Sequence, residues 1–166
     1  MTQHPVRVRL AMADDLPTIN EIYNYYVATS TCTYQKDPSP AAERAEWFAA
    51  HDAAHPVTVA ERDGQVVGWG ALSDYRVRWG YRFTVENSVY VRHDAQRCGI
   101  GRALLIDLIE RARALGYHTI IAGISADETG SVRLHEQAGF TPAGQVREVG
   151  HKFERWLDVL FMQLLL

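Results

Sequence analysis

A glycine-rich turn before an expected helix is the segment of this sequence best suited to binding an anion. Residues 89–102 read VYVRHDAQRCGIGR, so a strand-like run gives way to a loop with glycines at positions 99 and 101. Glycine lets the backbone approach a ligand closely because no Cβ intervenes. The first amides of a helix have no intrahelical partner, and together with the helix dipole they favour an anion such as a pyrophosphate. A glycine-rich helix start that binds nothing is the alternative.

Other phosphate and metal motifs fit the sequence less well. A P-loop requires GxxxxGK[ST], and no such run occurs. A dinucleotide fingerprint requires GxGxxG in a strand–helix–strand unit, whereas this turn contains only GxG. The run from His51 to His55 resembles the zinc motif HExxH, but it lacks the glutamate and stands just before Pro56. We therefore expect no metal site.

Two further groups of residues could do chemistry. Glu86 lies within TVENSVYV, a run of mostly apolar or small residues, where burial would raise the pKa of its carboxyl toward that of a useful base. An outward-facing charge on an edge strand is the alternative, because glutamate is almost always exposed. Arg76 and Arg78 stand in the aromatic loop DYRVRWG, and a guanidinium can hold a carboxylate or phosphinate with two parallel bonds. A solvated basic loop is the alternative there.

The composition limits the class of protein that carries these residues. At 166 residues the chain can bury roughly 70% of its unfolded surface, so we expect one domain spanning residues 1–166 with a core of its own. A net charge of −3 argues against a nucleic-acid partner. The most apolar run, LDVLFMQLLL, is about half the length of a membrane helix, and no secretory signal is visible. With two unpaired cysteines, these features favour a soluble cytoplasmic protein and no membrane partner.

The hydrophobic periodicity and turn residues predict the elements that position these residues. Ser39 and Pro40 predict a helix start, as a capping hydroxyl followed by proline at the first helical position. The order of the expected helices and strands along the chain is typical of a mixed α/β sheet, antiparallel in its first half and followed by a strand–helix–strand unit. The expected elements are a strand over Val6–Arg9, helices over Asp14–Ala28 and from Pro40 to about Asp52, a hairpin of 56–62 and 65–72 joined by Asp63-Gly64, a strand over Thr84–Val91, a helix over Gly99–Leu115 closed by Gly116, a strand over Thr119–Ser125, a helix over Ser131–Ala138 closed by Gly139, and one or two strands to Leu166.

Several motifs in one order resemble a known family. Residues 96–101, QRCGIG, match the [QR]xxGx[GA] signature of the GNAT acetyltransferases, and residues 131–140 are similar to the short helix of that family that ends in Gly-Phe. Residues 80–82, 84–91, 134–136 and 152–158 more narrowly resemble the phosphinothricin and methionine sulfoximine acetyltransferases. The resemblance extends over nearly the whole chain.

The resemblance implies a GNAT fold, with a mostly antiparallel sheet splayed open in the middle and flanked by helices. Acetyl-CoA would lie in the opening, between the strand that ends at Val91 and the strand over 119–125. The backbone of Val89, Tyr90 and Val91 would pair with its pantetheine arm. The amides of Arg97, Cys98, Gly99, Ile100, Gly101 and Arg102 would hold its pyrophosphate. Glu128 stands where the family usually has an asparagine that contacts the cofactor, and a carboxylate cannot donate the hydrogen bonds of an amide.

The resemblance also implies the reaction and its residues. Glu86 would be the general base for direct acetyl transfer to the amine of a small amino-acid analogue, of the methionine sulfoximine, methionine sulfone or phosphinothricin type. His135 would protonate the leaving thiolate in place of the usual tyrosine, unless it only caps or packs its helix. The acceptor would be lined by Arg76, Val77, Arg78, Asn87 and Ser88, and relatives imply a homodimer. A GNAT enzyme for polyamines or protein N-termini, and a non-catalytic acetyl-CoA-binding module, are the alternatives.

Overall fold

A seven-stranded sheet organises the computed structural model, which describes residues 5–166. The strand order is β1-β2-β3-β4-β5-β7-β6, and every neighbouring pair is antiparallel except β4 with β5. Asp63 and Gly64, both with positive φ, form the tight turn of the expected β2–β3 hairpin. The strands are β1 (Arg7–Leu10), β2 (Val57–Arg62), β3 (Gln65–Asp74), β4 (Thr84–Val91), β5 (Thr119–Ser125), β6 (Thr141–Lys152) and β7 (Arg155–Leu165).

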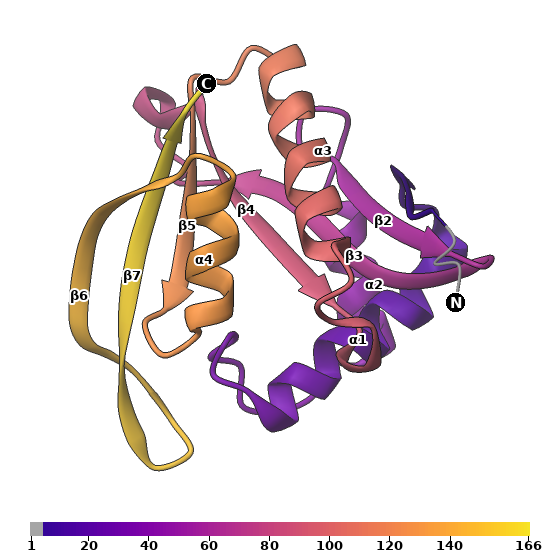
Figure 1. The fold of residues 1–166 in the computed structure, drawn as a ribbon, viewed down its shortest axis with the longest axis horizontal. Coiled ribbons are helices and arrows are strands. Elements are labelled where there is room, and N and C mark those ends of the chain that lie inside the picture. The colour runs from indigo at the N-terminus through magenta and orange to yellow at the C-terminus, as the bar shows by residue number, and fades with distance from the viewer. Residues whose placement is uncertain (1–4) are drawn as a thin grey trace.

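The one parallel pair is also the place where the sheet opens. Strands β4 and β5 pair only from Thr84 opposite Thr119 to Glu86 opposite Ile121. Beyond Glu86 the two strands run apart, as Figure 1 shows, and the edge of β4 that faces β5 has no strand partner. The expected mixed sheet, mostly antiparallel and splayed in the middle, is confirmed.

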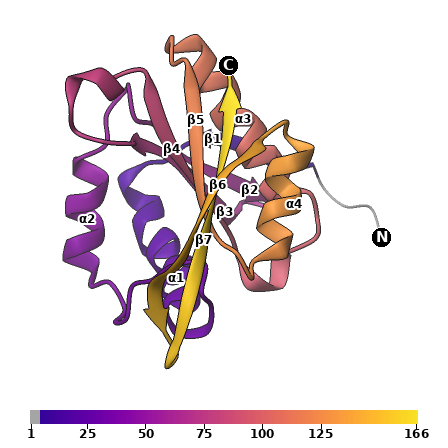
Figure 2. The same cartoon turned by 90° about the vertical axis from the view of Figure 1, so that its left-hand side faces the viewer.

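Two layers of helices cover the two faces of the sheet (Figure 2). Helices α1 (Leu16–Thr29) and α2 (Ala41–Ala49) lie on one face, and α3 (Ile100–Ala114) and α4 (Thr129–Gln137) lie on the other. Successive side chains of a strand point to opposite faces. On β4, Val85 packs into the core with residues of α3, whereas Tyr90 packs against Trp69 and the core of α1. Glu86 and Ser88 therefore share the α1/α2 face with Tyr90.

Helix α3 ends as the sequence predicts. Gly116 has a φ of 81°, and its amide donates to Arg113 O at 3.1 Å while the amide of Tyr117 donates to Ala112 O at 3.0 Å. This pair of bonds is the Schellman motif, in which a left-handed residue satisfies the last carbonyls of a helix. None of the helices within residues 5–166 is long and apolar enough to span a membrane.

The expected start and end of α2 are wrong. Pro40 is the N-cap and not the first helical residue, no side chain caps the helix, and the helix ends at Ala49 instead of about Asp52. Ser39 is buried, and its backbone bonds to the amide side chains of Asn20 and Asn24. Those bonds fix the chain before the helix, so the hydroxyl of Ser39 is not needed as a cap.

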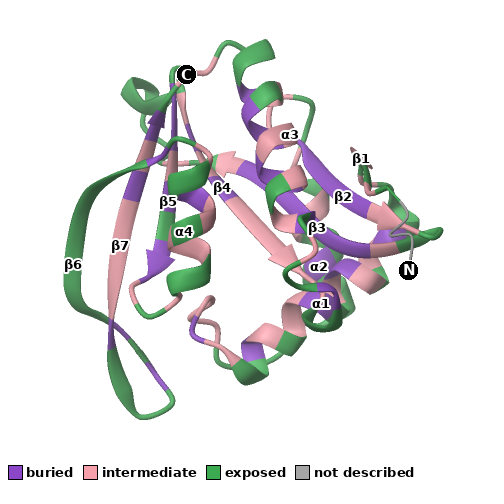
Figure 3. Cartoon of the chain, in the orientation of Figure 1, coloured by how far each residue is buried: buried purple, intermediate pink, exposed green. Residues whose placement is uncertain are grey.

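The C-terminal segment forms two strands. Strands β6 and β7 make a hairpin whose turn residues, Phe153 and Glu154, both have positive φ. Strand β6 is the sheet edge and is exposed along nearly its whole length, as the green strand of Figure 3 shows.

Candidate active site

A cleft of about 220 Å³ lies where β4 and β5 separate. Its walls come from both diverging strands, from the start of α4 and from the loop after α1. The cleft brings together seven of the predicted site residues. These are Glu86, Asn87, Ser88, Val89, Tyr90, Glu128 and His135, and the other lining residues are Cys32, Thr33, Ala122, Gly123, Ile124, Ser125 and Ser131.

Glu86 is the carboxylate at the point where the two strands part. It is the last residue of β4 that pairs with β5, it is half-buried, and no hydrogen bond or ion pair holds its side chain within residues 5–166. Burial raises the pKa of Glu86 above its ordinary value. A methyl group at Gly123 would lie 3.3 Å from Glu86 Oε1, so this glycine leaves room for the carboxylate. Because β4 is a central strand, the alternative of a charge on an edge strand is wrong.

His135 is a buried, neutral imidazole. Its Nδ1 lies 2.8 Å from Ser131 O, a carbonyl that can only accept, so Nδ1 carries the proton. Its Nε2, 2.9 Å from Asn87 Nδ2, then accepts from that amide. Burial lowers the pKa of His135, which favours this neutral form. The oxygen of Asn87 is buried with no hydrogen-bond partner among the described residues.

Acidification is expected to remove the stability that His135 contributes. Because its folded pKa lies below the ordinary 6.5, that contribution is present in full above about pH 6.5 and is lost as the pH falls through the lower folded pKa. Replacing His135 by glutamine should therefore lower the free energy of unfolding more at about pH 7.5 than at about pH 5.5. Urea unfolding measures this difference, with His118→Gln, at an exposed histidine, as the matched control. An equal loss at both pH values would contradict the neutral, buried imidazole.

The predicted phosphate loop presents free amides. Arg97 and Gly99 have φ values of 58° and 78°, and α3 begins at Ile100 without a side-chain cap. The first intrahelical bond runs from Ala103 N to Gly99 O, so the amides of residues 100–102 precede it. Gly101 itself packs against α4, since a methyl there would lie 3.2 Å from Leu134 Cδ2. The arrangement suits an anion at the helix N-terminus.

Glu128 binds the loop after α1, a contact that no sequence motif predicted. It is the N-cap of α4, and its Oε1 accepts a hydrogen bond of 2.6 Å from the Ser30 hydroxyl. The ammonium of Lys152 donates to the carbonyls of Ser30 and Thr33, each at 2.7 Å. These bonds hold the loop after α1 against the cleft, where Cys32 and Thr33 become part of the wall. The carboxylate that replaces the usual asparagine thus has a partner within the chain.

The predicted acceptor loop stands apart from the cleft. Arg76, Val77 and Arg78 are all exposed, Val77 to 98%, and none of them lines the cleft. The guanidinium of Arg76 lies over the ring of Tyr75, 5.1 Å from its centroid. The structure therefore does not bring these three residues together with Glu86, and their contact with an acceptor stays a prediction.

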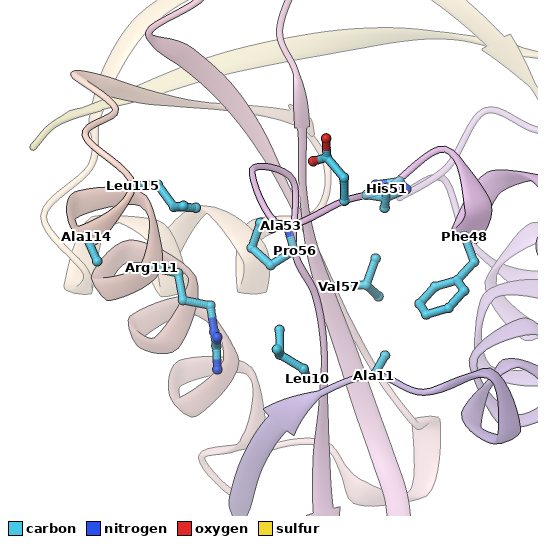
Figure 4. Close-up of a pocket in the computed structure, with 11 residues that line it drawn as sticks. Leu10, Ala11, Phe48, His51, Ala53, Pro56, Val57, Arg111, Ala114 and Leu115 are labelled. Atoms are coloured by element: carbon cyan, nitrogen blue, oxygen red, sulfur yellow. The ribbon is translucent and has the colours of Figure 1, made fainter.

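A pocket larger than the cleft lies away from these residues, between the ends of α2, β1 and α3 (Figure 4). It measures about 440 Å³ and includes His51 of the HDAAH run. His51 is engaged by Trp47 O and Ser73 Oγ, and no group of three or more metal-ligating side chains occurs in residues 5–166. The lining residues are Leu10, Ala11, Phe48, His51, Asp52, Ala53, Pro56, Val57, Arg111, Ala114 and Leu115.

Comparison with known proteins places this geometry in a family. Residues 19–140 match the model of the Acetyltransferase (GNAT) family. The chain is 44% identical to an L-methionine sulfoximine/L-methionine sulfone acetyltransferase of Pseudomonas aeruginosa, over 95% of this chain and 92% of the relative. It is 42% identical to a phosphinothricin N-acetyltransferase of Alcaligenes faecalis, over 94% of this chain and 80% of the relative.

Solved structures that resemble this fold are also acetyltransferases. An acetyltransferase from Salmonella typhimurium, solved with its cofactor acetyl-CoA, superposes with a TM-score of 0.93 at 40% identity, over 96% of this chain and 93% of that one. A ribosomal-protein-alanine N-acetyltransferase from Brucella melitensis superposes with a TM-score of 0.94 at 42% identity, over 96% and 99%. The chain belongs to the GNAT family of acetyltransferases and has the GNAT fold.

Proposed function

We propose that this acetyltransferase moves the acetyl group of acetyl-CoA directly to the α-amine of a small amino-acid analogue. The acceptor is of the methionine sulfoximine, methionine sulfone or phosphinothricin type, the compounds named for the relatives from Pseudomonas aeruginosa and Alcaligenes faecalis. The observation that carries the proposal is the half-buried carboxylate of Glu86 where β4 and β5 separate, which has no ion-pair partner among the described residues.

Glu86 is the general base in this proposal. An ammonium is not nucleophilic, so the amine must lose a proton, directly or through water, before it takes the acetyl group. The raised pKa of Glu86 brings its basicity closer to neutral pH, where a base is most effective. His135 is the second candidate for moving protons, toward the departing thiolate. It must first carry a proton on Nε2, which requires Asn87 to turn its amide and present oxygen instead of nitrogen.

The chain's own groups fit acetyl-CoA, which supplies the acetyl group as a thioester. The backbone of Val89, Tyr90 and Val91 belongs to the part of β4 that has no strand partner toward β5, so it would hold the pantetheine arm. The amides of Arg97, Cys98, Gly99, Ile100, Gly101 and Arg102 would hold the pyrophosphate. Glu128 lines the same cleft. Arg76, Val77, Arg78, Asn87 and Ser88 remain the proposed acceptor lining.

A panel of acceptors tests the proposed function. Purified enzyme and acetyl-CoA are incubated with methionine sulfone, methionine sulfoximine, phosphinothricin, methionine and spermidine, and free thiol and acetylated product are measured. A peptide that begins with alanine joins the panel because of the ribosomal-protein-alanine enzyme from Brucella melitensis. We expect the three amino-acid analogues to give the highest kcat/KM. If spermidine or the peptide is the best acceptor, the proposed substrate class is wrong.

A homodimer in the cytoplasm completes the proposal. Large apolar side chains stand exposed at Val77, Trp79 and Trp156, with exposures of 98%, 76% and 64%, and a second copy of the chain would cover some of them. Light scattering of the eluting protein measures the mass. A monomer at micromolar concentration would contradict the proposed dimer but not the proposed acetyl transfer.

A further inference from the structure

A second cavity lies next to the cleft on the face of the sheet that α1 and α2 cover. This cavity, called the Arg44 cavity below, measures about 210 Å³. It shares Ser88 and Tyr90 with the cleft, so the two are neighbours. Its lining residues are Tyr23, Gln35, Ser39, Glu43, Arg44, Trp47, Trp69, Ser73, Ser88 and Tyr90.

The register of the sheet places the Arg44 cavity beside Glu86. Ser73 of β3 is the direct partner of Glu86 on β4, and Ala71 is the partner of Ser88. Side chains of such partners lie on the same face, with their Cβ atoms about 4.5–5.5 Å apart. Because Ser73 and Ser88 both line the Arg44 cavity, it begins one side chain away from Glu86.

Arg44 is a buried cation that forms no ion pair with any residue in the described part of the chain. Its side chain is carried by α2 and only 5% of the residue is exposed. Its Nε donates to Asn20 Oδ1 at 3.2 Å, and no other hydrogen bond or ion pair is made by its guanidinium within residues 5–166. The rings of Tyr23, Trp47 and Trp69 surround it, with centroids 4.4, 4.6 and 5.8 Å from its Cζ.

The aromatic rings do not replace an anion. Burial lowers the pKa of Arg44, which is the sign of a positive charge that lacks its solvent shell. Glu43 stands at the rim of the cavity, but it is exposed and forms no ion pair with Arg44. A guanidinium fork with free terminal N–H groups suits the two oxygens of a carboxylate.

A second buried donor, in a ring next to Arg44, also lacks an acceptor among the described residues. Trp69 is 2% exposed, and its Nε1 is buried without a hydrogen-bond partner among the described residues. Buried indole N–H groups usually have a partner. Within residues 5–166, the terminal N–H groups of the Arg44 guanidinium and the indole N–H of Trp69 thus have no acceptor oxygen.

We propose that the Arg44 cavity binds the α-carboxylate of the acceptor, with the Arg44 guanidinium and the Trp69 indole N–H as its donors. The inference rests on the proposed function, because it takes an α-amino acid as the acceptor. In such an acceptor one carbon separates the amine from the carboxylate, so an amine at Glu86 places the carboxylate beside Ser73 and Ser88. Arg76 and Arg78, which are exposed in the loop after β3, are then left for the distal polar group.

The test compares methionine sulfone with its α-carboxamide, which differs only at the proposed carboxylate. We expect the wild-type kcat/KM for the acid to exceed that for the amide by about ten- to a hundred-fold, the usual worth of hydrogen bonds to a charged group. In Arg44→Gln this ratio should fall toward one, and the loss should be on the acid. Arg44→Lys keeps the charge without the fork and should give an intermediate ratio.

A matched control separates recognition from packing. Arg82 also stacks on aromatic rings, with its Cζ 3.4 Å from the centroid of Trp79, but it lines none of the pockets described above. Arg82→Gln should keep the wild-type ratio. A folded Arg44→Gln variant that also keeps the wild-type ratio would show that Arg44 only fills its aromatic surroundings, and the inference would be overturned.

Trp69→Phe provides a second test of the inference if Arg44→Gln does not fold. This variant removes the indole N–H and retains an aromatic ring, so it should reduce the acid-to-amide ratio several-fold. An unchanged ratio in Trp69→Phe, with no folded Arg44→Gln, would overturn the inference.

Equilibrium binding distinguishes failure of this inference from failure of the proposed function. The tryptophans of the Arg44 cavity report binding by their fluorescence when acid or amide is titrated without acetyl-CoA. A wild-type protein that acetylates neither compound contradicts the proposed function, yet tighter binding of the acid, lost in Arg44→Gln, still supports the carboxylate site. Equal binding of acid and amide by the wild-type protein overturns it.

Discussion

Replacement of Glu86 by glutamine is expected to slow acetyl transfer by about 10²–10⁴-fold, the usual contribution of a general base. Glutamine keeps the shape of the side chain but cannot take a proton from the amine. Acetyl-CoA affinity should survive, because the proposed phosphate loop at the start of α3 is not altered. Steady-state kinetics and calorimetry measure the two effects, and Glu110→Gln, at an exposed glutamate of α3, is the matched control.

The pH dependence gives this prediction a second readout. Since only the ionised base is active, wild-type kcat/KM should fall as the pH drops through the raised pKa of Glu86, and the glutamine variant should lack that decline. Stability changes in the opposite sense. A raised folded pKa means that the contribution of Glu86 to stability is present below about pH 4.5 and is lost as the pH rises through the folded pKa.

The glutamine variant should therefore unfold at higher urea concentration than the wild type at neutral pH, because it removes an unpaired, half-buried charge. The variant should show no such advantage at about pH 4, where Glu86 of the wild type is protonated in both the folded and the unfolded state. Near wild-type turnover in Glu86→Gln would exclude this residue as the base.

Replacement of Gly99 by alanine is expected to weaken acetyl-CoA binding by about 5–30-fold. Gly99 has a φ of 78°, and no atom lies within 4 Å of an added methyl, so the change adds strain without a clash. Holding a non-glycine residue in the left-handed conformation costs about 1–2 kcal/mol, which corresponds to that loss of affinity if binding requires the observed loop. Calorimetric titration with acetyl-CoA measures the affinity.

Gly116 supplies the matched control at the other end of the same helix. Its φ is 81° and it also has open space around it, so Gly116→Ala carries a similar strain. That variant should lose stability but keep the wild-type affinity for acetyl-CoA, because position 116 lies far along α3 from the loop. If both variants bind acetyl-CoA equally well, the assignment of the phosphate loop is wrong.

The features that the sequence predicted well depend on local signals. Alternating apolar residues predict strand β4, and helical periodicity predicts α3 with its closing Gly116. Residues that tolerate positive φ predict the turn at Asp63-Gly64. The start of α2 was misjudged because the side chains of Asn20 and Asn24, distant in the sequence, bind the backbone of Ser39 and replace a local cap.

The site was predictable where a motif marks it and not where folding alone assembles it. Glu86 and the loop before α3 lie within family motifs. The wall made by Cys32 and Thr33 depends on hydrogen bonds to Glu128 and Lys152, which are about a hundred residues away. Burial of Arg44 among aromatic rings of α1, α2 and β3 has no local signature either.

The most direct test of the account follows the acetyl group itself. Acetyl-CoA with an isotopically labelled acetyl group is incubated with methionine sulfone and the wild-type enzyme, and the products are analysed by mass spectrometry and NMR. We predict one N-acetylated product, labelled on the α-nitrogen and formed in equal amount to free CoA, with the rate reduced by about 10²–10⁴-fold in Glu86→Gln. Release of CoA without this product, or a label on any other atom of the acceptor, would contradict the account.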